Sequence, residues 1–517
     1  MSMVLRRLGK SVLLLERGSH PRFAIGESST PFANLLLERI AEQYDLPFLR
    51  SLSEWGSWQR DFPELPAGLK RGFTFYHDTQ GRPLDPADSA KQLLVAASPN
   101  DRVADTHWYR RDFDAFLVAR AQELGVTFRD HAEIADATNG SDGWEITVRG
   151  KNPFVAKARF VVDATGPSGF PFCGTSIMPC PFMPETAGVF AHFRNVPRMD
   201  EIAPALRCRG WTRLGPGALA GSAAASLHPF PYPPDDAAVH HVFPGGWIWV
   251  LRFNNGITSA GAALARNSEF DFNLEPRELW LSIIRRFPTL NAIFQSAEPV
   301  TPFYFSPRLA FRRTKVVGPN WAALPSAAGF VDPLLSTGFA LNLLGILRLS
   351  RAFESCSADS SSHETETFRE LEAAADLVSA LYAKMDRLEA FALLSVLYFA
   401  ALSYTETAWR LGKRELKSGF LLANDPPFSS SRADICARGR AGEPITREAI
   451  AKIIKPYDVA GLSDWNRFPF YPVDFADLTA SAHKLNATAT DLEYLLAKLG
   501  SQQSTATEEP RCETECA

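Results

Sequence analysis

The arrangement of apolar and polar residues predicts alternating buried strands and amphipathic helices along most of the chain. The apolar run at 321–324 predicts a buried strand, small residues follow it, and a long apolar stretch predicts a helix through residue 349. The first turn of this helix carries Ser336, Thr337 and Gly338. Orphan backbone N–H groups and the helix dipole meet there, so the junction is able to bind an anion, although an ordinary strand-to-helix turn has the same pattern.

The first sixteen residues predict the end of a helix, a turn at Gly9 and a buried parallel strand that ends at Glu16. An acidic residue at the end of the second strand of a dinucleotide-binding fold accepts the ribose hydroxyls. In that fold a first strand and a glycine-rich turn precede this helix. We therefore expect an N-terminal truncation of about 15–25 residues before Met1, unless the protein lacks this pyrophosphate cradle.

Spacing within the predicted strands decides which side chains share a face. Trp247 and Trp249 are two residues apart and share one face of a strand. His240 and His241 are adjacent and face opposite sides, so they form no common metal site, and we expect no metal. Residues 69–75 alternate like a strand that enters a sheet.

Capping and small-residue signals predict further elements. A polar loop leads to a helix at 31–44, with Ser29 or Thr30 as its N-cap and Pro31 at its first position. An apolar run at 160–163 predicts a buried strand that closes on a Thr-Gly turn.

Composition and charge narrow the class of protein. Of the 517 residues, 46% are hydrophobic and 22% charged, which predicts two or three packed units and excludes a disordered chain. A net charge of −4 creates no basic field and argues against a nucleic-acid partner. The most apolar run, 391–404, is too short to span a bilayer, so we expect a buried helix and no transmembrane segment. Scattered cysteines without a CxxC pair favour a cytoplasmic location.

Five segments resemble, in the same order, motifs of flavin-dependent halogenases and related FAD-dependent monooxygenases. They are HPRFAIGES, LKRGFTF, VVDATG, GWIWV and AAGFVDPLLSTG. The tryptophan-halogenase branch carries a glutamate two residues before the matching threonine, and Leu335 stands there in this chain. The resemblance is therefore nearest to the phenol- and pyrrole-type enzymes.

The resemblance implies an α/β fold: an FAD-binding Rossmann-like domain of the GR2 type, an inserted β-sheet substrate domain and a helical C-terminal region. We expect the FAD-binding domain at 1–170 and 297–355, with an incomplete first βα unit. The substrate-domain sheet is expected at 171–296, the helical region at 356–500 and a disordered tail at 501–517.

The resemblance also implies which residues do the chemistry. Lys70 stands at the position of the catalytic lysine, Thr337 and Gly338 at the halide site, and Trp247 and Trp249 beside the flavin tunnel. The alternatives are a solvated surface lysine and an aromatic pair that packs a sheet core. The positions implied for FAD are Glu16, Arg17, Arg22, Gly26, Glu27, Ser28, Arg110, Asp163, Thr165, Gly166, Ser326, Gly329, Asp332, Pro333 and Gly338.

The function implied is that of an FAD-dependent oxidoreductase, a halogenase that uses reduced FAD and O₂ on an aromatic or similar small molecule. One alternative is an FAD-dependent hydroxylase or a geranylgeranyl-reductase-like enzyme, favoured by Leu251-Arg252 where halogenases have Ile-Pro. Another is a non-catalytic relative, favoured by Pro325-Ser326 where the family has Gly-Asp. The expected partner is a small-molecule substrate, and the resemblance leaves room for a separate flavin reductase.

Overall fold

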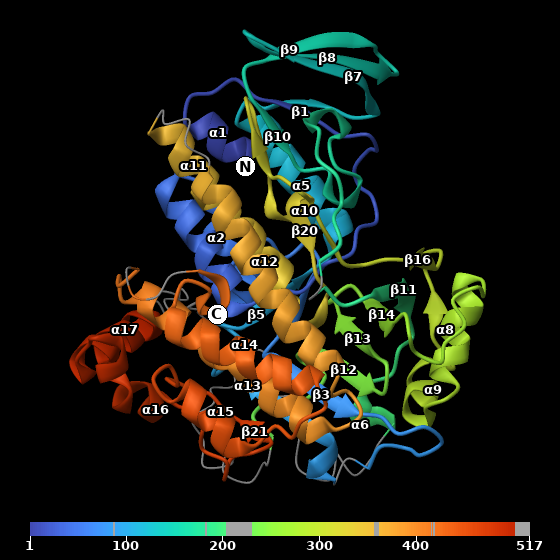
Figure 1. The fold of residues 1–517 in the computed structure, drawn as a ribbon, viewed down its shortest axis with the longest axis vertical. Helices are drawn as coiled ribbons and strands as arrows, with labels where there is room; N and C mark the ends of the chain where they lie inside the picture. Colours follow the sequence, from blue (N-terminus) through green and yellow to red (C-terminus); the bar gives the residue numbers. More distant parts are fainter. Residues whose placement is uncertain are drawn as a thin grey trace, which may run out of the picture.

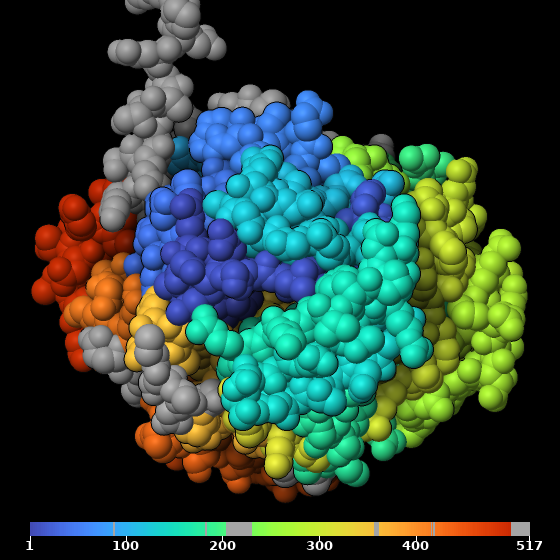
Figure 2. Space-filling model, turned by 90° about the horizontal axis from the view of Figure 1, so that it is seen from above, coloured from blue at the N-terminus to red at the C-terminus, as the bar shows by residue number. Residues whose placement is uncertain are grey.

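Short parallel strands lie in the upper part of the molecule in Figure 1, the end that Figure 2 shows from above. The computed structural model describes residues 1–85, 88–180, 183–202, 230–355, 361–414, 416 and 419–501. In it β1 (Leu13–Leu15) pairs in parallel with β6 (Thr127–Arg129), and β10 (Val161–Asp163) pairs in parallel with β19 (Trp321–Ala323). The helices nearest to these strands in the chain are α1 (Ser2–Arg7), α5 (Arg110–Glu123), α10 (Pro325–Ala328) and α11 (Thr337–Glu354). The α/β fold class predicted from the sequence is confirmed.

A three-stranded antiparallel meander caps the same end (Figure 1). Its strands are β7 (Ala132–Gly140), β8 (Gly143–Gly150) and β9 (Phe154–Ala158). The buried Trp144 of β8 donates a hydrogen bond of 2.9 Å from its indole Nε1 to the carbonyl oxygen of Asn320. This bond ties the meander to β18 (Val317–Gly318) and β19, which pair with each other in antiparallel fashion.

The largest sheet among the described residues has nine strands and is drawn from separate parts of the chain. In space it runs β15-β11-β14-β13-β12-β3-β4-β21, and β16 pairs with β11. The strands are β3 (Gly72–His77), β4 (Gln92–Ala96), β11 (Thr186–Arg194), β12 (Ala238–Phe243), β13 (Gly246–Arg252), β14 (Thr258–Ala265), β15 (Glu298–Pro299), β16 (Tyr304–Ser306) and β21 (Phe470–Tyr471). The sheet therefore extends beyond the range 171–296, and the predicted domain limits stay predictions.

Both faces of this sheet are covered, which accounts for its nearly continuous apolar sequence. Ile248 packs with α8 (Pro276–Ile284) and α9 (Pro288–Phe294) in one apolar core. Trp247 and Trp249 lie on the other face and join the core shared with the C-terminal helices. The two-residue period of a strand thus places both tryptophans together, as predicted.

Helices cover the tryptophan face and make up most of the C-terminal part of the chain (Figure 1). They are α2 (Pro31–Gln43), α11, α12 (Ser361–Tyr382), α13 (Leu388–Arg410), α14 (Pro426–Arg440), α15 (Arg447–Ile454), α16 (Phe475–Ala480) and α17 (Ala489–Ser501). Thr30 caps α2 by accepting a hydrogen bond from the N–H of Ala33, one of the two caps predicted. Of the tail predicted to be disordered at 501–517, Ser501 is the last residue of α17, and the positions from 502 onward lie outside the described residues.

Helix α13 is the buried helix predicted from the most apolar run of the sequence. By length and composition it is able to cross a membrane, and it is the one such helix among the described residues. However, 83% of its most apolar window is buried inside the protein. It exceeds the predicted run 391–404 because polar residues extend it at both ends, and it packs on β3, where the rings of Phe391 and Phe75 lie 5.5 Å apart.

One predicted strand is wrong: residues 69–75 form two strands in different sheets. β2 (Ala67–Lys70) pairs with β5 (Asp105–Trp108), whereas β3 belongs to the large sheet. Arg71 lies between them, and its backbone N–H donates to the carbonyl oxygen of Asp236 while its own carbonyl accepts from Ala97. The chain crosses between sheets here, so Lys70 lies at their junction. The other short elements are α3 (Phe48–Ser51), α4 (Trp55–Asp61), α6 (Met199–Ile202), β17 (Phe311–Arg312) and β20 (Gly329–Phe330).

Candidate active site

Lys70 is fully buried, and its ammonium group has defined partners. Nζ donates hydrogen bonds to Ser28 Oγ at 2.9 Å and to the carbonyl oxygen of Ser29 at 2.5 Å. It also lies 4.0 Å from the centre of the Phe73 ring. The solvated surface lysine considered from the sequence is therefore wrong.

Asp105 lies directly opposite Lys70 in the antiparallel pairing of β2 with β5. Asn34 of α2 donates a hydrogen bond of 2.9 Å to its carboxylate. Burial lowers the pKa of Lys70, and the charge of Asp105 opposes that shift without cancelling it. Burial likewise raises the pKa of Asp105, against the charge of Lys70. Both shifts move the groups towards their neutral forms, so Lys70 is able to lose its proton at a pH well below that usual for a lysine.

Two buried histidines lie close enough to Lys70 to respond to its charge. Burial, and then the charge of Lys70, lower the pKa of both His107 and His240 to about 3, so both rings are neutral at physiological pH. The His240 ring is stacked against Phe75 at 4.5 Å and against Trp247 at 5.1 Å between ring centres. Lys70 therefore lies in a buried cluster of neutral imidazoles and aromatic rings.

The tryptophan pair connects the large sheet to the segment that resembles the second FAD-binding motif. The indole Nε1 of Trp247 donates to Asp332 Oδ1 at 3.3 Å and to Tyr382 Oη at 3.1 Å, and Tyr382 Oη donates to Asp332 Oδ2 at 3.0 Å. Burial raises the pKa of Asp332 to about 6. Asp332 thus uses both carboxylate oxygens within the protein. Trp249 lies beside Trp247, at 5.7 Å between ring centres.

The loop HPRFAIGES contacts both sheets. Glu27 and His192 of β11 form a buried pair, with His192 Nε2 2.9 Å from Glu27 Oε1. The other carboxylate oxygen, Oε2, is buried and has no hydrogen-bond partner within the described part of the chain. Phe23 lies edge-on to His192 at 4.8 Å. Together with the bond from Lys70 to Ser28, these contacts fix the loop between the lysine and the large sheet.

The remaining residues implied for FAD lie in the parallel-strand end of the fold. Glu16 follows β1 and accepts hydrogen bonds from the N–H of Gly18 and from Arg22. Burial acts to raise the pKa of Glu16, but these two partners outweigh it and lower the pKa. Arg110 pairs with Asp114 and donates to the carbonyl oxygen of Gly26. Arg17 is exposed.

Asp163 holds the turn that follows β10. Its carboxylate accepts from the N–H and hydroxyl of Thr165 and from the N–H of Phe170. Gly166 has a φ of 65°, in the left-handed region that favours glycine. Both carboxylate oxygens of Asp163 therefore accept hydrogen bonds within the turn itself. A direct contact between this carboxylate and the cofactor stays a prediction.

The segment before α11 has an unusual backbone. Leu335 and Ser336 both have positive φ, 65° and 55°, although neither is a glycine. Ser336 is the N-cap of α11, and its side chain makes no capping hydrogen bond within the described residues. Thr337 is buried and Gly338 follows it in the first turn. The N–H groups in the first turn of this helix have no side-chain cap among the described residues and are therefore available to an anion.

The remaining positions implied for FAD, Ser326, Gly329 and Pro333, precede Ser336 in the chain. The N–H of Ser326 donates to Asn342 Oδ1 at 2.9 Å. At Gly329 a Cβ atom would lie 2.9 Å from both Leu371 and the carbonyl oxygen of Phe311, so only glycine allows this close approach. Pro333 leads into the strained turn.

Sequence reasoning missed several members of the site. Asp105, Asn34 and His192 carry no motif of their own and reach Lys70 or the loop only through pairing between distant segments. His240 was considered only as a metal ligand. The two faces predicted for His240 and His241 are confirmed, because His241 pairs instead with Asp78 at 2.8 Å on the opposite face.

Comparison with known proteins shows which proteins the chain resembles. No family model matches the chain. The chain is 28% identical over 347 residues to the monodechloroaminopyrrolnitrin halogenase PrnC of Pseudomonas fluorescens, which covers 65% of this chain and 56% of that protein. It is 27% identical to the tetracycline 7-halogenase of Kitasatospora aureofaciens, over 65% of this chain and 58% of the relative. The resemblance to flavin-dependent halogenases is confirmed, and the chain spans somewhat more than half the length of these curated relatives.

Solved structures share the fold. The halogenase PltM, in a structure with phloroglucinol and FAD, superposes with a TM-score of 0.77 at 22% identity and covers 91% of this chain and 96% of that chain. The flavin-dependent brominase Bmp2 superposes with a TM-score of 0.55 at 17% identity, over 85% of this chain and 94% of its own. The chain therefore shares its fold with these two halogenase structures.

Proposed function

We propose that this protein is an FAD-dependent halogenase that acts on an aromatic or similar small molecule, with Lys70 as the residue that delivers the halogen. The observation that carries the proposal is the buried Lys70, held by Ser28 and Ser29 and shifted towards the neutral amine. The similarity to PrnC and to the tetracycline 7-halogenase supports the same class of reaction.

The residues present fit an FAD cofactor. In the loop implied to lie beside the cofactor, Glu27 Oε2 is a buried acceptor without a partner among the described residues, and the uncapped start of α11 offers N–H groups to an anion. Glu16, at the end of β1, would accept ribose hydroxyls, and Thr337 with Gly338 would bind the halide. When bound, reduced FAD with O₂ would supply the oxidant that converts the halide to hypohalous acid.

Lys70 has two chemical options towards hypohalous acid. As a neutral amine it attacks the halogen, forms an N–halogen bond and releases water. As an ammonium group it holds the acid by a hydrogen bond and keeps it beside the substrate. The lowered pKa favours the first option, because the neutral amine is the nucleophile.

The buried pair of Glu27 and His192 is suited to orient the loop that carries Ser28. Through Ser28 this loop positions the amine of Lys70. Trp247 and Trp249 would then form the wall between flavin and substrate. We further propose a cytoplasmic location and a separate flavin reductase that supplies reduced FAD.

The test is product formation by the wild type, Lys70→Ala and Lys157→Ala, with reduced FAD, O₂, bromide and a panel of phenols and pyrroles. Lys157 is an exposed lysine on β9 and serves as the matched control. We expect halogenated product from the wild type and Lys157→Ala, and from Lys70→Ala only peroxide release at an unchanged rate. A Lys70→Ala variant that halogenates normally would contradict the role of Lys70. Hydroxylated or reduced product at every bromide concentration would instead favour the alternative oxidoreductase.

A further inference from the structure

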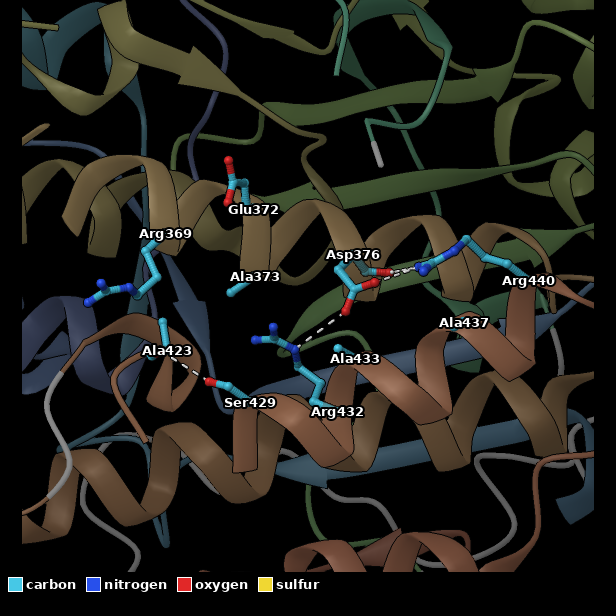
Figure 3. A pocket seen from close by; sticks show the side chains of 10 residues that line it. All are labelled: Arg369, Glu372, Ala373, Asp376, Ala423, Ser429, Arg432, Ala433, Ala437 and Arg440. Atoms are coloured by element: carbon cyan, nitrogen blue, oxygen red, sulfur yellow. Dashed lines mark hydrogen bonds and ion pairs between the residues drawn. The ribbon is translucent and has the colours of Figure 1, made fainter. Parts of the chain in front are cut away.

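A groove of about 440 Å³ lies between α12 and α14 and shares no residue with the candidate active site. Figure 3 shows its lining from close by. Four alanines, Ala373, Ala423, Ala433 and Ala437, make up its apolar part. Ser429 and charged side chains of α12 and α14 complete the lining, and two of these charged side chains, Asp376 and Arg432, are largely buried.

Arg432 is the unusual member of this lining. Its side chain is only 8% exposed, and its guanidinium points from α14 towards α12 (Figure 3). Nε lies 3.6 Å from Asp376 Oδ2, too far for a hydrogen bond. Both Nε and Nη1 are buried without a hydrogen-bond partner among the described residues. A buried cation with open donors is costly to maintain unless a ligand supplies acceptors.

The other arginines of the groove are already paired. Arg440 donates to Asp376 Oδ1 at 2.6 Å, and Arg369 pairs with Glu366 at 2.9 Å. The unmet demand for an acceptor is therefore concentrated on the one guanidinium of Arg432. A planar guanidinium with open donors matches the two oxygens of a carboxylate.

Charge decides which anion fits. The carboxylates of Glu372 and Asp376 also line the groove and would repel a dianion such as phosphate. A monoanion is repelled less strongly than a dianion. The alanine surface favours a ligand in which an apolar group is attached to that monoanion. We propose that the groove between α12 and α14 is a binding site for a small organic carboxylate, with Arg432 as the residue that holds the carboxylate.

Benzoate is a suitable probe, because it joins one carboxylate to a flat apolar ring. Calorimetric titration of the wild type should show one benzoate bound per chain in this groove. Arg432→Met should weaken that binding at least tenfold, because methionine keeps the length of the side chain but offers no donor. Arg438→Met changes an exposed arginine of the same helix, paired with Glu443, and should leave binding unchanged.

A second variant keeps the guanidinium and fills the space. Ala433→Leu should abolish benzoate binding although Arg432 is still present. This variant tests whether the space in the groove is needed in addition to the charge of Arg432. Inorganic phosphate at the same concentration should give the same heat when it is titrated into the wild type and into Arg432→Met, because it does not bind in the groove. The proposal is overturned if the wild type binds no benzoate, if Arg432→Met and Ala433→Leu bind it as the wild type does, or if phosphate binds as well as benzoate.

This experiment is independent of the halogenase proposal. Lys70→Ala should bind benzoate in the groove with unchanged affinity, because Lys70 lies at the end of β2 and does not line the groove. Benzoate heat that disappears in Lys70→Ala and persists in Arg432→Met would assign the binding to the active site and overturn the groove site.

Discussion

Lys70 and Arg432 are both buried basic side chains, but they differ in how their hydrogen-bond donors are satisfied. Lys70 donates to Ser28 and to the backbone of Ser29, and it lies across from Asp105. Arg432 makes one long ion pair with Asp376 and no hydrogen bond among the described residues. The surroundings of Lys70 are complete without a ligand, whereas those of Arg432 are not.

The chemistry of the two side chains explains why this difference matters. A lysine that is taken out of water is able to lose its proton, and burial lowers the pKa of Lys70 accordingly. An arginine keeps its charge in every protein environment and needs an anion instead. Burial thus favours the neutral amine of Lys70, which we propose as the reactive group, and leaves Arg432 charged, which we propose as the group that holds a carboxylate. The first of these statements is the central claim of the proposed function.

The largest expected effect is on stability. Lys70→Met removes the donor from two buried acceptors, Ser28 Oγ and the carbonyl oxygen of Ser29, so we expect a loss of about 2–5 kcal/mol in the free energy of unfolding. Arg432→Met removes a cation that makes no hydrogen bond, and we expect a change of only about 0–1 kcal/mol. Urea denaturation of both variants measures the contrast. Equal losses at the two positions would contradict the comparison.

The next effect is on catalysis. Lys70→Arg keeps a positive charge but cannot supply a neutral amine, so halogenated product should fall about 100-fold or more. Flavin oxidation and peroxide release should continue at the wild-type rate. Product yield per oxidised flavin separates the two quantities. Retention of most of the product by Lys70→Arg would show that a fixed cation is enough.

The smallest effect is a shift in pH dependence. The rate of halogenation should rise with pH through the pKa of Lys70, because the neutral amine is the reactive form. Ionised Asp105 raises that pKa against the effect of burial. Asp105→Asn removes the charge, so the pKa of Lys70 falls further and the acid limb of the profile moves to lower pH by about one unit. Asp142→Asn, an exposed change at a hairpin tip, should leave the profile in place.

Patterns within a single helix or strand correctly predicted features that depend only on neighbouring residues in the sequence. The cap at Thr30, the buried helix around Phe391 and the shared face of Trp247 and Trp249 all follow from spacing within one element. The five motifs likewise predicted the class of fold before any contact was known.

Contacts between distant segments could not be predicted in this way. The break at Arg71 depends on hydrogen bonds to Asp236 and Ala97, far along the chain or on another strand. Asp105 reaches Lys70 only through the register of β2 with β5, and a shift of one residue would have turned it away. The alternation at 69–75 reads as one strand because the pattern carries no sign of the change of sheet.

The protonation of Lys70 tests the central claim most directly. Lysine labelled at Nζ with ¹⁵N allows each ammonium group to be titrated by NMR, and the Lys70→Arg variant identifies the signal of Lys70 by its loss. We predict that Lys70 loses its proton at a pH well below that of the other lysines, near neutrality, because burial disfavours its charged form. A Lys70 signal that titrates together with the surface lysines would contradict the account.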